Sequence, residues 1–247
     1  NVIKLKTRIC LLFKYLTVAT KSQSKLNRIA LVINNIKFHD ETLNLDGCEK
    51  DDGVMSRLLQ NLGYQVVLYR NLTGQEIDDA LTEFSKHIKL SYTDSVFVII
   101  MSHGNIGIIS GTDSKTFEIE KIFLRLNTKN CPALVNKPKI IIIDACRGGN
   151  SQLDQRIYLS DSLVHIEKDL ICFHSSTPHT ASYFLPTKGS FFIQTLSDVF
   201  NKWSYVCDIE ELFRKVSLMT GRTDLAAHWS QLRLKKSLGS VTKRFSN

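Results

Sequence analysis

The sequence contains little proline and glycine, and this scarcity limits how the chain can be organised. Its 247 residues include only 4 prolines and 12 glycines, which leaves little room for long flexible linkers. Hydrophobic residues make up 43% of the chain and charged residues 23%, a composition that excludes a mainly disordered, collagenous or coiled-coil protein. A chain of this length forms one large domain or two small domains with a sizeable core.

The sequence also lacks a hydrophobic run long enough to cross a bilayer. Residues 9–19 are apolar, but they are interrupted by Lys14 and fall short of the roughly 20 residues that a membrane span needs. Residues 1–28 contain no acidic residue and residues 221–247 contain one, so the net charge of +8 is concentrated at the two ends. Because the central part is slightly acidic, we expect neither a nucleic acid nor a membrane as a partner.

The six cysteines are widely spaced, and no two of them form a Cys-x-x-Cys pair. Structural zinc sites use such pairs, and small secreted domains use dense disulphide frameworks. The histidines His165, His174 and His179 show no recurring ligand spacing. The sequence therefore predicts reduced thiols, a cytoplasmic location, and neither a metal nor a cofactor.

Strand patterns and helix patterns alternate along the chain. Short, almost wholly apolar runs, typical of strands buried on both faces of a parallel sheet, occur at residues 29–34, 65–69, 95–101, 139–143 and 169–173. Apolar residues at helical spacing occur in residues 49–62, 73–89, 119–126, 190–203 and 208–218. This alternation predicts an α/β fold in which helices cover a mostly parallel central sheet.

Two of the predicted strands end in residues that can perform chemistry. Residues 95–101 lead into His103 and Gly104, and residues 139–143 lead into Cys146. Active sites of such sheets lie at the carboxyl ends of the strands, so His103 and Cys146 are expected at one edge. There an imidazole would activate the thiol, and glycine would let backbone N–H groups approach a reacting carbonyl. The spacing alone leaves open the alternative that the two side chains never meet.

The segments around these residues resemble the caspases, cysteine endopeptidases that cleave after aspartate. The segment DACRG resembles the family's Gln-Ala-Cys-x-Gly motif, and the candidate histidine lies upstream of it, as in that family. Further segments resemble caspases in caspase order, among them NRIALVIN, LLQNLGYQVVLYRNLT, TDSVFVIIMSHG, NKPKIIIIDACRG and HIEKDLICFHSSTP. The resemblance covers residues 25–220 and is closest to the inflammatory branch. It implies a three-layer sandwich with helices on both faces of the sheet.

The resemblance also implies an organisation into parts, as in a zymogen. The parts are a basic lead-in (1–24), a large-subunit part (25–150), a short intersubunit linker (151–164) and a small-subunit part (165–247). Asp154 and Asp161 in the linker are candidate processing sites. In caspases an apolar C-terminal strand helps to pair two protomers, whereas this C-terminus is rich in lysine, which suits an exposed edge better.

Roles for individual residues follow from the same resemblance. Cys146 is the expected nucleophile, His103 the general acid and base, and the backbone N–H groups of Gly104 and Cys146 the expected oxyanion hole. Ser182 and Tyr183 are expected to hold the substrate backbone and line the neighbouring pocket.

The expected substrate pocket departs from the family in two places. Arg28 matches one of the two arginines that bind the substrate aspartate. The glutamine of the motif is Asp144 here, and the second arginine is Phe184. We expect Asp144 to pair with Arg28 and thereby to occupy the guanidinium that a substrate aspartate would need.

Three functions remain open at this point. The first is a caspase-type endopeptidase that hydrolyses protein substrates in inflammatory or apoptotic signalling. The second is a catalytically impaired homologue that acts as a regulatory partner or decoy, pairing as a homodimer or as a heterodimer with related caspases. The third retains catalysis but changes the residue after which the enzyme cleaves, because Asp144 attracts a basic side chain.

Overall fold

A computed structural model gives the fold of residues 27–146, 169–175, 184–185 and 188–221. The strands of its central sheet are β1 (Ile29–Asn34), β2 (Gln65–Arg70), β3 (Val96–Met101), β7 (Lys139–Asp144) and β8 (Leu170–His174). They lie in the order β2-β1-β3-β7-β8, and all neighbouring pairs are parallel. Every residue of β1, β3 and β7 is buried, which explains why these strands are almost wholly apolar in sequence.

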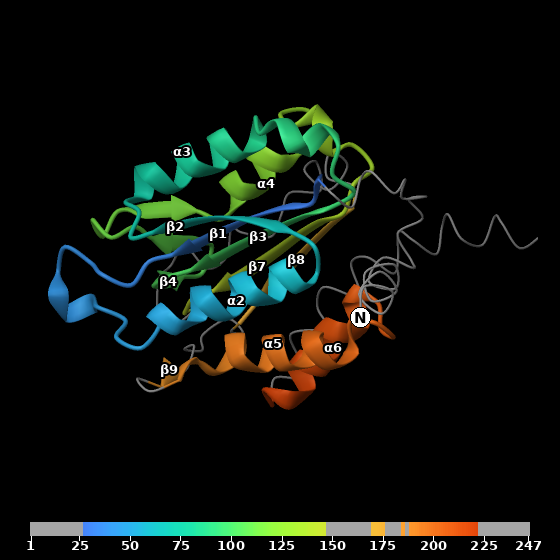
Figure 1. Cartoon of the computed structure of the whole chain (residues 1–247). Helices are drawn as coiled ribbons and strands as arrows, with labels where there is room; N and C mark the ends of the chain where they lie inside the picture. The colour runs from blue at the N-terminus through green and yellow to red at the C-terminus, as the bar shows by residue number, and fades with distance from the viewer. Residues whose placement is uncertain (1–26, 147–168, 176–183, 186–187, 222–247) are drawn as a thin grey trace, which may run out of the picture.

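Helices cover both faces of this sheet (Figure 1). One face carries α3 (Gly74–Ser85) and α4 (Glu120–Leu126). The other carries α2 (Glu49–Asn61), α5 (Phe191–Trp203) and α6 (Ile209–Met219). The predicted three-layer α/β architecture is therefore confirmed. None of the described helices has the length and hydrophobicity needed to span a bilayer.

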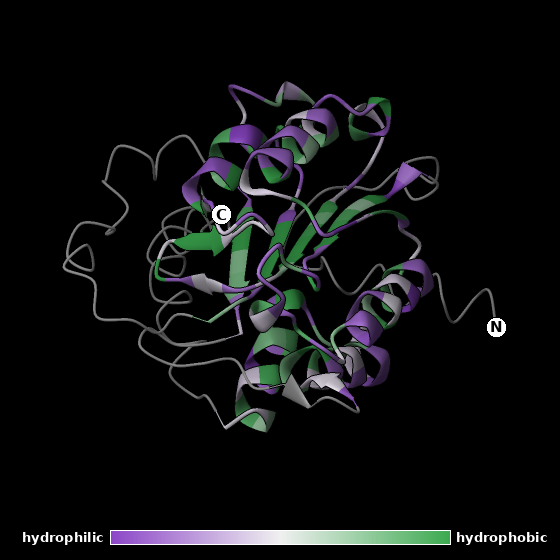
Figure 2. Cartoon of the chain, turned by 90° about the vertical axis from the view of Figure 1, so that its left-hand side faces the viewer, coloured by the Kyte–Doolittle hydropathy of each residue, from purple (hydrophilic) through white to green (hydrophobic). Residues whose placement is uncertain are grey.

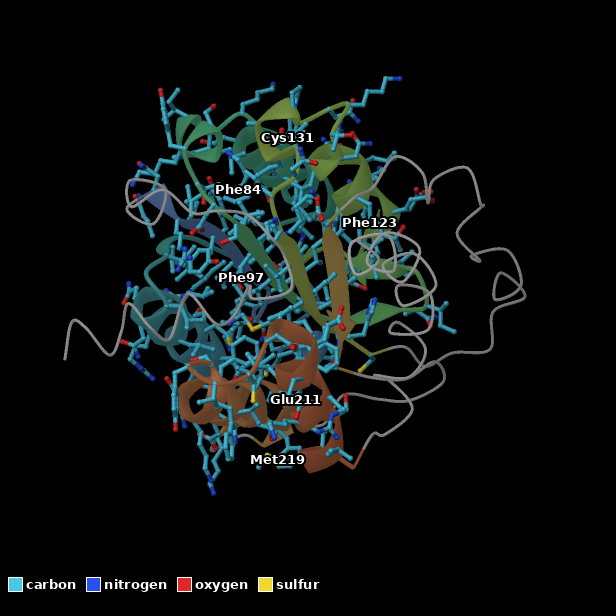
Figure 3. The ribbon with its side chains drawn as sticks, turned by 90° about the vertical axis from the view of Figure 1, so that its right-hand side faces the viewer. Phe84, Phe97, Phe123, Cys131, Glu211 and Met219 are labelled. Carbon is cyan, nitrogen blue, oxygen red and sulfur yellow. The ribbon has the colours of Figure 1, made fainter. Side chains whose placement is uncertain are left out.

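Each face of the sheet has its own hydrophobic core, because successive side chains of a strand point to opposite faces. On β3, Phe97 and Ile99 belong to the core shared with α2, α5 and α6, whereas Val98 and Ile100 belong to the core shared with α3 and α4. Figure 2 shows the hydrophobic strands between helices of mixed hydropathy. In Figure 3, Phe97 lies at the level of the sheet, between Phe84 on one side and α6 on the other.

The predicted helix over residues 73–89 is shorter in the structure. It begins as expected, because the Thr73 side chain and Glu76 form a reciprocal capping box. It ends at Ser85, and a short 3₁₀ helix, η3 (Ile88–Ser91), follows. The backbone of His87 is extended, and its ring Nδ1 accepts the Lys89 N–H, so a local side-chain cap replaces the last helical turn.

Two small antiparallel units escaped the sequence prediction. The first is a three-stranded sheet of β4 (Gly104–Asn105), β5 (Ile108–Ser110) and β6 (Thr116–Glu118). The second pairs β9 (Phe184–Leu185) with β10 (Gly189–Ser190). Strands of two or three residues are too short to show a periodic pattern. Both units adjoin the carboxyl edge of the central sheet, where β3 and β7 end.

Candidate active site

The register of the central sheet places His103 and Cys146 at the same edge. In the parallel pair of β3 and β7, Met101 lies opposite Asp144, and His103 and Cys146 each follow two residues later. The Ser102 N–H donates to the Asp144 carbonyl oxygen at 3.1 Å, which continues the ladder past the strand ends. His103 and Cys146 are both half-buried and line one pocket.

A backbone carbonyl fixes the ring of His103. Its Nε2 lies 2.8 Å from the carbonyl oxygen of Leu43, at the end of the 3₁₀ helix η2 (Glu41–Leu43). A carbonyl oxygen only accepts hydrogen bonds, so Nε2 carries the hydrogen and Nδ1 of the neutral ring is the proton acceptor. The ring of Phe38 packs beside the imidazole at a centroid distance of 5.0 Å. Sequence analysis missed the Leu43 contact because a backbone carbonyl has no sequence signature.

Gly104 brings the chain after His103 close to the cysteine segment. A Cβ atom at this position would lie 2.7 Å from the Ile108 carbonyl oxygen and 3.0 Å from the Cβ of Ala145. Only glycine allows this approach without displacing backbone. The close packing of β4 against residues 145–146 therefore depends on glycine at position 104.

Two buried carboxyl groups line the same pocket as the cysteine and the histidine. Asp144 ends β7, and Asp51 lies in the first turn of α2; their exposed fractions are 7% and 2%. Asp51 accepts the Ser190 N–H at 2.9 Å and the side-chain amide of Gln194 at 3.2 Å. Burial raises the pKa of Asp51 to about 7; the negative charge of Asp144 acts in the same direction, and the Ser190 hydrogen bond opposes both.

A second cysteine, Cys48, lies in this pocket but is not a candidate nucleophile. Burial, and secondarily the charge of Asp51, raise the pKa of its thiol far above the ordinary value. Its thiol therefore stays protonated at neutral pH. Within the described residues, no group of three or more His, Cys, Asp or Glu side chains is arranged to hold a metal ion.

Comparison with known proteins decides the family of this chain. The family model named Caspase domain matches residues 27–232. The chain belongs to the caspase family. Curated relatives include Caspase a and Caspase b of Danio rerio, each 40% identical, and Caspase-1 of Canis lupus familiaris, 39% identical. These alignments cover 89%, 91% and 84% of this chain and 61%, 57% and 57% of the relatives, so the chain spans about three fifths of the relatives' length.

A solved structure shows the same fold. The crystal structure of Caspase-1 from Spodoptera frugiperda aligns with a TM-score of 0.69 and 24% sequence identity, over 81% of this chain and 78% of that chain. The resemblance to caspases inferred from the sequence is thus confirmed, as is the fold that it implies.

The expectation that Arg28 binds the substrate of this caspase domain is wrong. Arg28 directly precedes β1 and lies at the amino edge of the sheet, opposite the edge that carries Cys146. It is buried, with 1% of its surface exposed. Its Nε and Nη2 donate to both carboxylate oxygens of Asp94, and its Nη1 donates to the Leu62 carbonyl oxygen. The expected pair between Arg28 and Asp144 is excluded for the same reason.

The remaining predicted residues of the caspase site are placed only in part. Phe184 begins β9, and its backbone pairs with Ser190, which lines the pocket. The backbone of Phe184 is therefore adjacent to the pocket. Outside the described residues lie Ser182, Tyr183, Asp154, Asp161, the linker 151–164 and the C-terminal residues 222–247.

Proposed function

We propose that this caspase domain is a cysteine endopeptidase in which Cys146 is the nucleophile and His103 the general acid and base. The observation that carries the proposal is the parallel register of β3 and β7, which brings both residues to one edge and into one pocket. The Leu43 carbonyl supports it, because it leaves Nδ1 of His103 as the proton acceptor.

The first half of the reaction transfers the acyl group to the enzyme. Nδ1 of His103 takes the proton of the Cys146 thiol, and the thiolate sulfur attacks the substrate carbonyl carbon to form a C–S bond. Backbone N–H groups of Gly104 and Cys146 stabilise the oxyanion that develops on the carbonyl oxygen. The C–N bond then breaks, and the imidazolium returns its proton to the leaving amine.

The second half releases the product. Nδ1 of His103 takes a proton from water while the water oxygen attacks the thioester carbonyl. The C–S bond breaks, and the imidazolium returns the proton to the departing thiolate. These steps use only groups of the protein and water. From its membership of the family we further propose that the protein cleaves protein substrates and forms dimers. We also propose that it acts in the cytoplasm, in inflammatory or apoptotic signalling.

Cleavage of a peptide library by the purified chain tests the proposal. We expect hydrolysis that the Cys146→Ala variant lowers by roughly 10⁴-fold or more, because the nucleophile and its base act as a unit. His103→Ala should cause a loss of similar size. Cys172→Ala is the matched control, since this buried thiol lies in β8, and should leave the rate unchanged. If the folded protein shows no Cys146-dependent cleavage of any peptide, the non-catalytic partner function replaces this proposal.

A further inference from the structure

The ring of His103 is held by a loop that lies outside the central sheet. This loop, residues 36–45, joins β1 to α2 and extends beyond the end of the sheet in Figure 1. It contacts the imidazole at two points: the Leu43 carbonyl oxygen lies 2.8 Å from Nε2, and the Phe38 ring packs beside the imidazole. The two contacts come from different parts of the loop, so both depend on how the loop folds back on itself.

The side chain of Asn44 connects these two contacts. Asn44 directly follows Leu43, and its Oδ1 accepts the Phe38 N–H at 2.8 Å. Of the two ends of an amide side chain only the oxygen accepts hydrogen bonds, so this contact also determines how the amide is oriented. The backbone N–H of Asn44 donates to the Glu41 carbonyl oxygen at 3.1 Å, at the end of η2. Asn44 therefore links the residue that holds Nε2 to the residue that packs against the ring.

A side chain is needed here because the loop is not a regular hairpin. At its base, the Leu45 N–H donates to the Ile36 carbonyl oxygen at 2.9 Å. Two residues further on, the Phe38 N–H pairs with a side chain where a hairpin would use a backbone carbonyl. Phe38 is 5% exposed, so the loss of the Asn44 oxygen would leave the N–H of a buried residue without this acceptor. The loop would then have to shift to satisfy that N–H.

The hydrogen bond between His103 and Leu43 lies where water can compete with it. Leu43 is 38% exposed, and the carbonyl can accept from water as well as from the ring. A neutral imidazole can carry its hydrogen on either nitrogen, and the hydrogen bonds around it decide which form predominates. The Nε2–H form is therefore secured only while the loop holds the Leu43 carbonyl in place.

We propose that Asn44 is a positioning residue that keeps the hydrogen of the His103 ring on Nε2. It acts through its bond to the Phe38 N–H, which holds the loop with the Leu43 carbonyl in place. Asn44 is not among the described residues that line the pocket. Its effect on catalysis rests on the proposed function, in which Nδ1 takes the proton of Cys146. Its effect on the ring does not require the chain to be an active enzyme.

Nitrogen-15 NMR of the full chain tests the effect on the ring. The spectra are recorded at a pH of about 8.5, where an ordinary imidazole is neutral and its two tautomers give different ring-nitrogen shifts. We expect His103, assigned by the signals that His103→Gln removes, to carry its hydrogen on Nε2. Asn44→Leu keeps the approximate size of the side chain and removes the acceptor, so it should give a mixture of both tautomers. Asn44→Asp keeps an acceptor oxygen and should restore the parent form.

Steady-state kinetics measures the catalytic consequence on a peptide whose hydrolysis depends on Cys146. Asn44→Leu should lower kcat roughly 10- to 100-fold with little change in KM, because the base is misplaced while the pocket keeps its residues. Asn44→Asp should recover most of this loss. If Asn44 only stabilised the fold, Asn44→Leu would lower the unfolding temperature and leave kcat of the folded variant unchanged, and the inference would be wrong.

The matched control is Asn127→Leu. The Oδ1 of Asn127 accepts the N–H groups of Lys129 and Asn130 at 3.1 and 2.8 Å, in the connection between α4 and β7. This is the same kind of contact between a side-chain amide and backbone N–H groups, but it does not involve the loop of residues 36–45. Asn127→Leu should therefore leave both kcat and the tautomer of His103 unchanged.

The outcomes separate this inference from the proposed function. A parent chain with mixed tautomers of His103, or an unchanged tautomer in Asn44→Leu, would overturn the inference. Equal losses of kcat in Asn44→Leu and Asn127→Leu would overturn it as well, as would a failure of Asn44→Asp to restore the parent tautomer. The expected tautomers without Cys146-dependent hydrolysis of any peptide would support the inference and contradict only the proposed function.

Discussion

At the scale of single residues, the candidate dyad depends on backbone groups as much as on its two side chains. The Leu43 carbonyl determines which nitrogen of His103 accepts a proton. The absence of a side chain at Gly104 lets β4 pack against residues 145–146. Both features position the groups that react, and neither adds a reactive group of its own. A cysteine and a histidine at the right places in the sequence are therefore not sufficient for catalysis, because backbone groups must also hold them in position.

Gly104→Ala should therefore impair catalysis more than folding. Its Cβ would displace β4 from the cysteine segment, so we expect kcat to fall about 100-fold, the loss typical of a misplaced oxyanion donor. Steady-state kinetics and thermal unfolding measure the two effects separately. Gly53→Ala is the matched control, because its Cβ in α2 meets only ordinary contacts and should stabilise the helix by about 0.5–1 kcal/mol. Unchanged kcat in Gly104→Ala would contradict this role.

The sequence predicted the site residues unevenly, and the reason is topological. The common edge of His103 and Cys146 could be predicted because both follow apolar strands, and parallel strands share a carboxyl edge. The position of Arg28 before a strand pointed to the opposite edge, but its role was assigned from family resemblance. Asn34 and Asp51 were missed because their relation to the pocket depends on three-dimensional packing rather than on a local motif.

At the scale of elements, α2 connects the two parts of the chain beside the pocket. Asp51 in its first turn accepts the N–H of Ser190, the residue that ends β10 and caps α5. α2 belongs to the predicted large-subunit part, and β10 and α5 belong to the predicted small-subunit part. The pocket is therefore assembled by a contact between segments that precede and follow the predicted linker.

This contact predicts a pH-dependent stability. The pKa of Asp51 rises from its ordinary value of 3.8 to about 7 on folding, so the folded state binds the proton more tightly. The free energy of unfolding should then fall as pH rises from about 4 to about 7, by a few kcal/mol. Asp51→Asn should lack this decrease, so the variant gains stability relative to the parent chain across that window and keeps the gain above pH 7.

Urea unfolding at several pH values measures the difference. Asp46→Asn is the control, because Asp46 is exposed and its removal should leave the pH dependence of the parent chain. Parallel pH profiles for Asp51→Asn and the parent chain would show that Asp51 titrates normally.

The elements themselves were predictable in proportion to their length. The five central strands and the helices α2, α3, α5 and α6 carry strong periodic patterns and appear where they were expected. The end of α3 was misjudged because the His87 side chain forms a local cap. The pairs β4–β5 and β9–β10 are too short for periodicity, yet they border the site.

At the scale of the whole molecule, the two edges of the sheet have separate tasks. The carboxyl edge carries the candidate dyad and the pocket that Asp51 and Asp144 line. The amino edge holds the buried pair of Arg28 and Asp94, where Ser95 donates to the same Asp94 oxygen that Arg28 Nε contacts. The Tyr64 ring lies 5.5 Å from the guanidinium of Arg28. This second cluster is remote from the chemistry and stabilises the fold.

Arg28→Met should accordingly unfold the protein more easily without altering the site. Removal of one partner leaves Asp94 buried and uncompensated, which typically costs about 3–5 kcal/mol. Urea unfolding measures this loss, and kcat/KM under conditions where the variant is folded should match that of the parent chain. The double variant Arg28→Met, Asp94→Leu should recover part of the stability. A large rise in KM in folded Arg28→Met would restore a role in substrate binding.

The contact between Asp51 and the turn before α5 also constrains how the chain can diverge. The N–H that Asp51 accepts comes from the backbone of Ser190, so the side chain at that position does not supply it. Gly189 has a positive φ of 83°, and a Cβ there would collide with the Asp51 carboxylate. A side chain at position 189 would thus need both a smaller residue at position 51 and a backbone conformation that L residues rarely adopt. Positions 51 and 189 are far apart in the sequence, yet a substitution at one limits the residues that the other can accept. This holds even though Gly189 has no side chain of its own.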